Sequence, residues 1–166
     1  LYTVTNYVAL GGNGGGDVTC GGSTVGMNGA GVTFVVGGSS TYSSSCAGVS
    51  GTAFCVAAGY NHVTLTAPGT GSSTQGLVVI GPTSSTNTSP ATFGEGASAT
   101  VVSGAFYFPY GPISLSGGAS LGNGSGQCLM LVGSQVTLSG GTAVASTCNI
   151  PGYSGSGSTG TIALVQ

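Results

Sequence analysis

Hydrophobic residues occur in short runs along most of this chain, and turn residues separate the runs. Between Gly76 and Gly118 the runs are rich in β-branched and aromatic residues, with Gly, Pro, Ser and Thr between them. Each run is too short for a helix, and none has apolar residues at helical spacing. The pattern therefore predicts short β-strands joined by tight turns. The strands expected here are 77–80, 100–102, 105–108 and 113–115.

A repeat is visible in the second half of the chain. ISLSGG at 113–118 returns as VTLSGG at 136–141, an offset of 23 residues, and 105–108 precedes the similar run 129–132 by 24. A period of this length with two or three short strands is typical of a parallel β-helix. We therefore expect an all-β chain folded as a right-handed parallel β-helix, a β-solenoid with about 23–28 residues per coil.

Equivalent residues of successive coils stack along the axis of such a fold. The segment VTLT at 63–66 reads as an earlier copy of the repeated strand. Two buried ladders are expected: Leu65, Leu115 and Leu138 in one, and Val79, Phe106 and either Leu129 or Leu131 in the other.

The length corresponds to about one domain, so we expect a single β-solenoid domain over 1–166. A polar excursion is expected at 37–56, and a flexible linker at 153–160 before a last strand at 161–165. The first residues already have the character of a strand and not of a signal peptide. We therefore expect the chain to be a C-terminal fragment of a larger precursor.

The scarcity of charged residues excludes several classes of function. Lys and Arg are absent, and the only acidic residues and histidine are Asp17, Glu95 and His62. Without cations the chain has nothing to neutralise a nucleic-acid backbone or to hold an anionic membrane surface. No apolar run is long enough for a membrane span. A hydrophobic fraction of 40% with a net charge of −2 also opposes disorder, despite 35 glycines.

The same scarcity of charge argues against catalysis. Acid–base chemistry requires a carboxylate or histidine within reach of a partner, and Asp17 and Glu95 are far apart in the sequence. His62 opens a strand and is expected to be a polar residue at a coil edge. One histidine without a C-x-x-C pair does not make a zinc site. We expect no enzyme activity, no cofactor and no metal.

Five cysteines lie in this Ser-, Thr- and Gly-rich chain, which is typical of an extracytoplasmic, oxidised protein. Cys46 and Cys55 bracket a short loop, and Cys128 and Cys148 bracket one pair of strands. We expect these two disulfides and leave Cys20 unpaired in this segment.

Surface motifs leave a second function open. The Thr-x-Thr segments at 3–5 and 64–66 are similar to the hydroxyl rows of ice-binding surfaces. Tyr107 and Tyr110 flank Pro109 in an aromatic corner suited either to a sugar or partner or to packing against a coil edge. An ice- or glycan-binding β-solenoid adhesin is therefore the alternative. The glycosylation sequons at 87–89 and 123–125 are frequent by chance in such a composition.

Several motifs carry a resemblance to a known family: GVTFVV at 31–36, HVTLTAP at 62–68, GLVVIGP at 76–82, SGAFYFPYGPISLSGG at 103–118 and QCLMLVGSQVTLSGG at 127–141. The chain resembles the C-terminal region of TadG-like proteins, which belong to the tight-adherence (Flp) pilus assembly systems of bacteria. The resemblance implies a non-enzymatic surface module that is pilus-associated or fibre-forming. Its partners would be copies of itself, stacked head to tail, or other domains of the assembly.

Overall fold

The chain is all-β in the part that its computed structural model describes. The described residues are 1–11, 18–20, 23–42, 46, 49–57, 60, 63–94, 101–117, 120–121, 129–140 and 143–144. Within them there are strands and no helix, and every strand pair except one hairpin is parallel. This confirms the expected all-β class and is consistent with a solenoid.

The strands form two large sheets and two small pairs. A seven-stranded sheet has two wings that share one long strand, β11 (Val101–Phe108). Its first wing holds β1 (Tyr2–Val4), β6 (Phe34–Val36), β9 (Leu77–Ile80), the second half of β11 and β14 (Leu129–Gly133). Its second wing holds β5 (Met27–Gly29), β8 (Val63–Thr66) and the first half of β11.

The five-stranded sheet and the small pairs complete the fold. The five-stranded sheet holds β2 (Val8–Leu10), β7 (Phe54–Val56), β10 (Ala91–Phe93), β12 (Ile113–Leu115) and β15 (Val136–Leu138). The small pairs are the antiparallel hairpin of β3 (Val18–Cys20) and β4 (Ser23–Val25), and β13 (Ser120–Leu121) beside β16 (Ala143–Val144).

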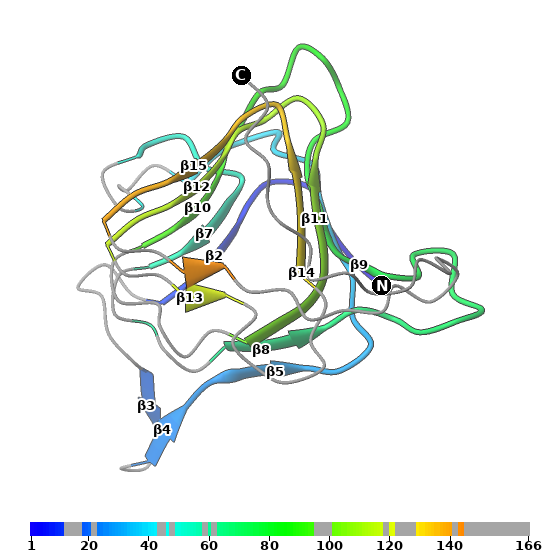
Figure 1. Cartoon of the computed structure of the whole chain (residues 1–166), viewed down its shortest axis with the longest axis vertical. Helices are drawn as coiled ribbons and strands as arrows, with labels where there is room; N and C mark the ends of the chain where they lie inside the picture. Colours follow the sequence, from blue (N-terminus) through cyan, green and yellow to red (C-terminus); the bar gives the residue numbers. More distant parts are fainter. Residues whose placement is uncertain are drawn as a thin grey trace.

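The chain winds around a common interior as a stack of coils (Figure 1). In each coil it passes from the first wing to the five-stranded sheet and then to a third side. The second wing and the pair of β13 and β16 form this third side. The described coils are β1-β2-β5, β6-β7-β8, β9-β10-β11, β11-β12-β13 and β14-β15-β16. β11 belongs to two coils because it turns a corner at Gly104, whose φ is 139°. A Cβ there would lie 2.6 Å from side-chain atoms of Ala67 and Val78, so only glycine fits.

Coil length differs between the two halves of the chain. Ile113 pairs with Val136, 23 positions later, as the repeat predicts. Val8, in contrast, pairs with Phe54, 46 positions later. The early coil is longer because the β3–β4 hairpin and the excursion are inserted between its strands. The excursion is also shorter than expected, because 54–56 is a buried strand of the sheet.

One expected ladder is present along the first wing. Val79 pairs with Phe106, and Phe106 pairs with Leu131, the second of the two leucines considered. The row continues toward the N-terminal end through Phe34 and Tyr2, whose rings stack with their centroids 5.6 Å apart. Stacking of like residues on successive coils therefore holds on this side.

The other expected ladder has a different member. Leu115 does pair with Leu138, but Leu65 lies on the second wing, where it pairs with Gly29 and Val102. The segment 63–66 is therefore not a copy of the repeated strand. Alternation places a residue inside or outside but does not tell which side of the interior its strand occupies. The ladder containing Leu115 runs instead through Leu10, Val56, Phe93, Leu115 and Leu138.

The expectation that Leu138 is buried is wrong. Its side chain is 49% exposed, whereas Leu115, one coil away in the same row, is fully buried. Among the described strands β15 is the last of the five-stranded sheet, so no described strand pairs with its outer edge. Stacking in register therefore does not by itself bury Leu138.

Three phenylalanines form the centre of the core. Phe54, Phe93 and Phe106 are fully buried and come from β7, β10 and β11. Their ring centroids are 5.2–6.0 Å apart with tilted or edge-on geometry, which aromatic rings favour. Neither the sheet of Phe93 nor its burial was expected, because its run of three residues follows a long polar loop.

The repeated LSGG motif marks the corner after β12 and β15. The backbone N–H and hydroxyl of Ser116 donate to the Phe93 carbonyl at 3.2 and 3.3 Å. Ser139 donates to the Leu115 carbonyl in the same way, at 3.0 and 3.4 Å. The glycine after each serine has a positive φ, 59° and 66°, which turns the chain toward the third side.

Candidate functional site

The predicted acid–base residues and the C-terminal cysteines fall in parts of the chain that the structure does not describe. Asp17, Glu95 and His62 all lie outside the described residues, as do Cys128 and Cys148. Cys20 lies on β3, but its side chain is not among those described. In the described part of the chain no group of three His, Cys, Asp or Glu residues is placed to hold a metal ion.

The excursion after β6 is tied down by a disulfide. Cys46 and Cys55 are bonded, with Cα atoms 5.9 Å apart, and this is the pair expected from the sequence. Cys55 lies on the outer side of β7, so the bond holds the excursion over the five-stranded sheet. Sγ of Cys46 lies 3.5 Å from the Thr92 carbonyl oxygen on the next strand. The outer side of this sheet is therefore closed at its middle coils.

Two buried hydroxyl groups at the contact between the excursion and the sheet lack a hydrogen-bond partner among the described residues. We call the excursion, held over β7 and β10, the cover. The hydroxyls of Thr52 and Thr92 are buried and have no hydrogen-bond partner among the described residues. A buried polar group of this kind costs about 1–3 kcal/mol. Thr92, Ser114 and Thr137 are register partners on the outer side of the sheet, so a row of hydroxyls exists here. The cover buries Thr92 at one end of this row, and Thr137 at the other end of the row is exposed.

The Thr-x-Thr segments do not form threonine rows. Thr3 is the register partner of Val35, and Thr64 is the partner of Asn28 and Val101. A flat ice-binding surface requires hydroxyls repeated at the strand spacing of about 4.8 Å. Thr66 and Ser103 are register partners and form one pair of hydroxyl residues, and neither segment supplies a longer repeat within the described coils.

The sequon at 87–89 has a structural role. Nδ2 of Asn87 donates to the carbonyls of Gly38 at 3.0 Å and Gly37 at 3.3 Å. Its Oδ1 accepts from the backbone N–H and the hydroxyl of Ser89 at 3.2 and 2.7 Å. Asn87 thus joins the loop after β9 to the start of the excursion. The second sequon lies outside the described residues.

The outer side of the first wing is apolar. Its register row contains Thr3, Val35, Ile80, Tyr107 and Val132, and its neighbouring row ends at the exposed Met130. Tyr107 and Tyr110 are both exposed near one corner. The sequence predicted these tyrosines as a corner. It did not predict the apolar row, because that row exists only through strand pairing.

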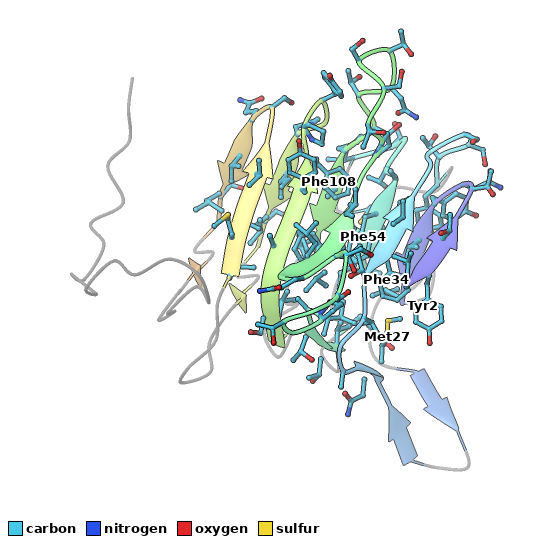
Figure 2. The ribbon with its side chains drawn as sticks, turned by 90° about the vertical axis from the view of Figure 1, so that its right-hand side faces the viewer. Tyr2, Met27, Phe34, Phe54 and Phe108 are labelled. Atoms are coloured by element: carbon cyan, nitrogen blue, oxygen red, sulfur yellow. A yellow bond between two sulfur atoms is a disulfide. The ribbon has the colours of Figure 1, made fainter. Side chains whose placement is uncertain are left out.

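The two ends of the stack are the largest departure from a closed fold. At the C-terminal end, Val136 and Leu138 belong to inward rows but are 42% and 49% exposed. At the other end, Tyr2 is 57% exposed although it continues the buried row of Phe34. Figure 2 shows Tyr2 on β1 at one extreme of the stack, with β14 and β15 toward the opposite extreme. Interior rows are therefore cut off at both ends.

Comparison with known proteins supplies no relative. No protein-family model, no curated protein and no solved structure matches this chain. The resemblance to TadG-like proteins therefore stays a prediction. Within the described residues there is also no helix with the length and apolar character required to cross a membrane.

Proposed function

We propose that this chain is a non-enzymatic structural module, a right-handed parallel β-helix that assembles end to end into a fibre at the bacterial cell surface. Its partners are copies of itself or neighbouring domains of a pilus-associated assembly. The observation that carries the proposal is the exposure of inward-row residues at both ends, Leu138 and Val136 at one and Tyr2 at the other.

An open end of a β-stack exposes both apolar side chains and unpaired backbone groups. Proteins usually protect such edges with charged residues, with Pro or with a covering segment. Lys and Arg are absent from this chain, and the described end strands contain no charged residue. With a net charge of −2, little repulsion opposes the approach of one copy to another. A head-to-tail contact of this type propagates unless rotation closes it.

The proposed location rests on two further observations. The Cys46–Cys55 disulfide fits an oxidising compartment, where such bonds persist. The motif resemblance to TadG-like proteins supports the surface of bacteria and a pilus-associated role. Both the location and the pilus association are open to direct test by fractionation of cells that produce the chain.

The test of assembly is sedimentation velocity and electron microscopy of the purified chain over a range of concentrations. We expect oligomers that grow with concentration and persist at high salt, because the contact is apolar. Leu138→Lys should reduce assembly at least about tenfold, whereas Tyr107→Lys, on the outer side of the first wing, should leave it unchanged. A strictly monomeric chain at tens of micromolar would exclude the fibre.

A glycan-binding adhesin is the second candidate, and the exposed pair Tyr107 and Tyr110 favours it. Exposed tyrosines present flat apolar faces with a polar tip, which suits them to stack on sugar rings. Titration against a panel of oligosaccharides tests this function. Binding that is lost in both Tyr107→Ala and Tyr110→Ala would support the adhesin, and absence of binding across the panel would remove it.

A further inference from the structure

The backbone of the five-stranded sheet has a fixed direction along the stack. The N–H groups of inward residues donate toward the C-terminal end of the stack. The N–H group of the residue that follows the last inward residue of a strand donates toward the N-terminal end. The forward bonds are Val8 to Ala53 at 2.9 Å, Ala91 to Pro112 at 2.9 Å and Ile113 to Gln135 at 2.8 Å. The backward bonds are Ala57 to Leu10 at 2.8 Å, Gly94 to Val56 at 2.8 Å and Ser139 to Leu115 at 3.0 Å.

This alternation determines which groups are free at the ends. In a parallel strand, successive residues direct their backbone groups to opposite neighbours. On β15 the N–H and C=O groups of Val136 and Leu138 therefore point away from β12. On β2 those of Ala9 point away from β7. One end thus offers the pattern that the other end needs in order to continue the ladder.

The side chains at the two ends match as well. One inward row of the sheet starts at Val8 and ends at Val136, and the other starts at Leu10 and ends at Leu138. Each row therefore begins and ends with the same residue type. A copy placed on the C-terminal end would set valine on valine and leucine on leucine without a change in the width of the interior.

The first wing has the same organisation. Its inward row starts at Tyr2 and ends at the half-buried Leu131, and its outward row starts at Thr3 and ends at Val132. Tyr2 already stacks on Phe34 of the next coil, so one face of its ring is turned toward that coil. In both sheets the rows begin on the first coil and end on the last. One rigid-body contact with another copy would therefore extend both sheets.

Resting on the proposed function, we propose that the partner at each end is a second copy of this chain, bound in one register. β15 of one copy pairs in parallel with β2 of the next, with Val136 beside Val8 and Leu138 beside Leu10. β14 pairs with β1, with Leu131 beside Tyr2 and Val132 beside Thr3. The contact is head to tail, and the coils run continuously from copy to copy.

The alternative occupant of the C-terminal end is the chain's own segment 145–166, which lies outside the described residues. That arrangement would cover Val136 and Leu138 within one molecule and give a monomer. The matched row ends at the opposite side of the stack favour the second copy, because a covering segment does not require them.

Cross-linking between two variants that each carry one added cysteine tests the register. Thr3→Cys and Val132→Cys each place a thiol on the outer side of an end strand, away from the interior. In the proposed register these thiols lie on adjacent strands, about 4.8 Å apart along the hydrogen-bonding direction, within the range of a disulfide. The two variants are mixed, oxidised and digested with a protease other than trypsin, since the chain lacks Lys and Arg.

The matched control replaces Val132→Cys with Met130→Cys, two residues earlier on the same outer side. That thiol is displaced by about 6.6 Å along the strand, beyond easy disulfide range. We expect the Thr3–Val132 peptide pair to exceed the Thr3–Met130 pair by about tenfold, measured against the oxidised parent chain as background.

Each other outcome has a distinct meaning. Oligomers with equal or greater cross-linking through Met130→Cys would overturn the register and leave the proposed function standing. A predominant Val132–Val132 pair would show a tail-to-tail dimer and overturn the head-to-tail contact. Monomers without any intermolecular pair would remove both the register and the fibre, and would indicate that the segment 145–166 covers the end.

Discussion

The two copies of the repeated strand have nearly the same sequence but differ in burial. Residues 113–116 read ISLS and residues 136–139 read VTLS, and 113–115 pair in register with 136–138. Leu115 in the first copy is fully buried, whereas Leu138 in the second is 49% exposed. β12 has a strand on each side, and β15 has one on a single side.

Leu115 and Leu138 thus differ in burial because of the strands beside them and not because of their own sequence. The same apolar alternation gives a core residue in the middle of the stack and an exposed apolar residue at its end. A stack in which each coil contacts only the adjacent coils behaves in this way, and its terminal units differ from the internal ones. The exposed copy is thus the source of the proposed contact between molecules.

The largest expected effect separates the two leucines directly. Leu115→Ala should reduce the free energy of unfolding by about 2–5 kcal/mol, because it leaves a cavity in a closed core. Leu138→Ala should reduce it by no more than about 1 kcal/mol, because the side chain is half exposed. Urea unfolding of both variants at low protein concentration measures the difference. Equal losses would contradict the comparison.

Removal of the disulfide tests whether the middle coils owe stability to their cover. The double variant Cys46→Ala, Cys55→Ala should lose about 2–3 kcal/mol of unfolding free energy, the value expected for closing a loop of this length. Assembly through the end strands should not change, since the cover lies over β7 and β10. A variant as stable as the parent would show that the excursion does not stabilise these coils.

Asn87 tests the second tie of the excursion. Asn87→Ala removes the bonds to Gly37 and Gly38 and to Ser89, and should reduce the unfolding free energy by about 1–2 kcal/mol. Ser85→Ala, in the same loop but exposed, is the matched control and should change it by less than about 0.5 kcal/mol. Thermal unfolding monitored by circular dichroism distinguishes the two. Equal effects would mean that the amide contributes no specific contact.

The smallest effect returns to the repeat. Ser116→Ala and Ser139→Ala each remove one hydroxyl bond to a carbonyl of the previous coil, at 3.3 and 3.4 Å. We expect a loss of about 1 kcal/mol for Ser116 and less for Ser139, because water replaces a bond more easily at an exposed position. Amide hydrogen exchange at the two corners would resolve the difference, and faster exchange after the Ser116 change than after the Ser139 change is the expected order.

The sequence by itself determined the local elements and the repeat. Short runs of β-branched and aromatic residues between turn residues predicted the strands around 77–80, 105–108 and 113–115, and the offset of 23 residues agrees with the pairing of 113–115 with 136–138. The short loop between Cys46 and Cys55 predicted their bond. These features depend on neighbours in the chain or on an exact repeat, which a single sequence displays.

Only the tertiary structure decided which side of the interior each strand occupies and which coil is last. In the structure Leu65 lies on the second wing, Phe93 packs in the aromatic centre, and Leu138 is exposed. The physical reason is that a period of two residues specifies inside and outside but carries no information about the partner strand. Pairing over 46 positions, as between Val8 and Phe54, leaves no repeat in the sequence, and the exposure of Leu138 follows from the place of β15 at the end of its sheet.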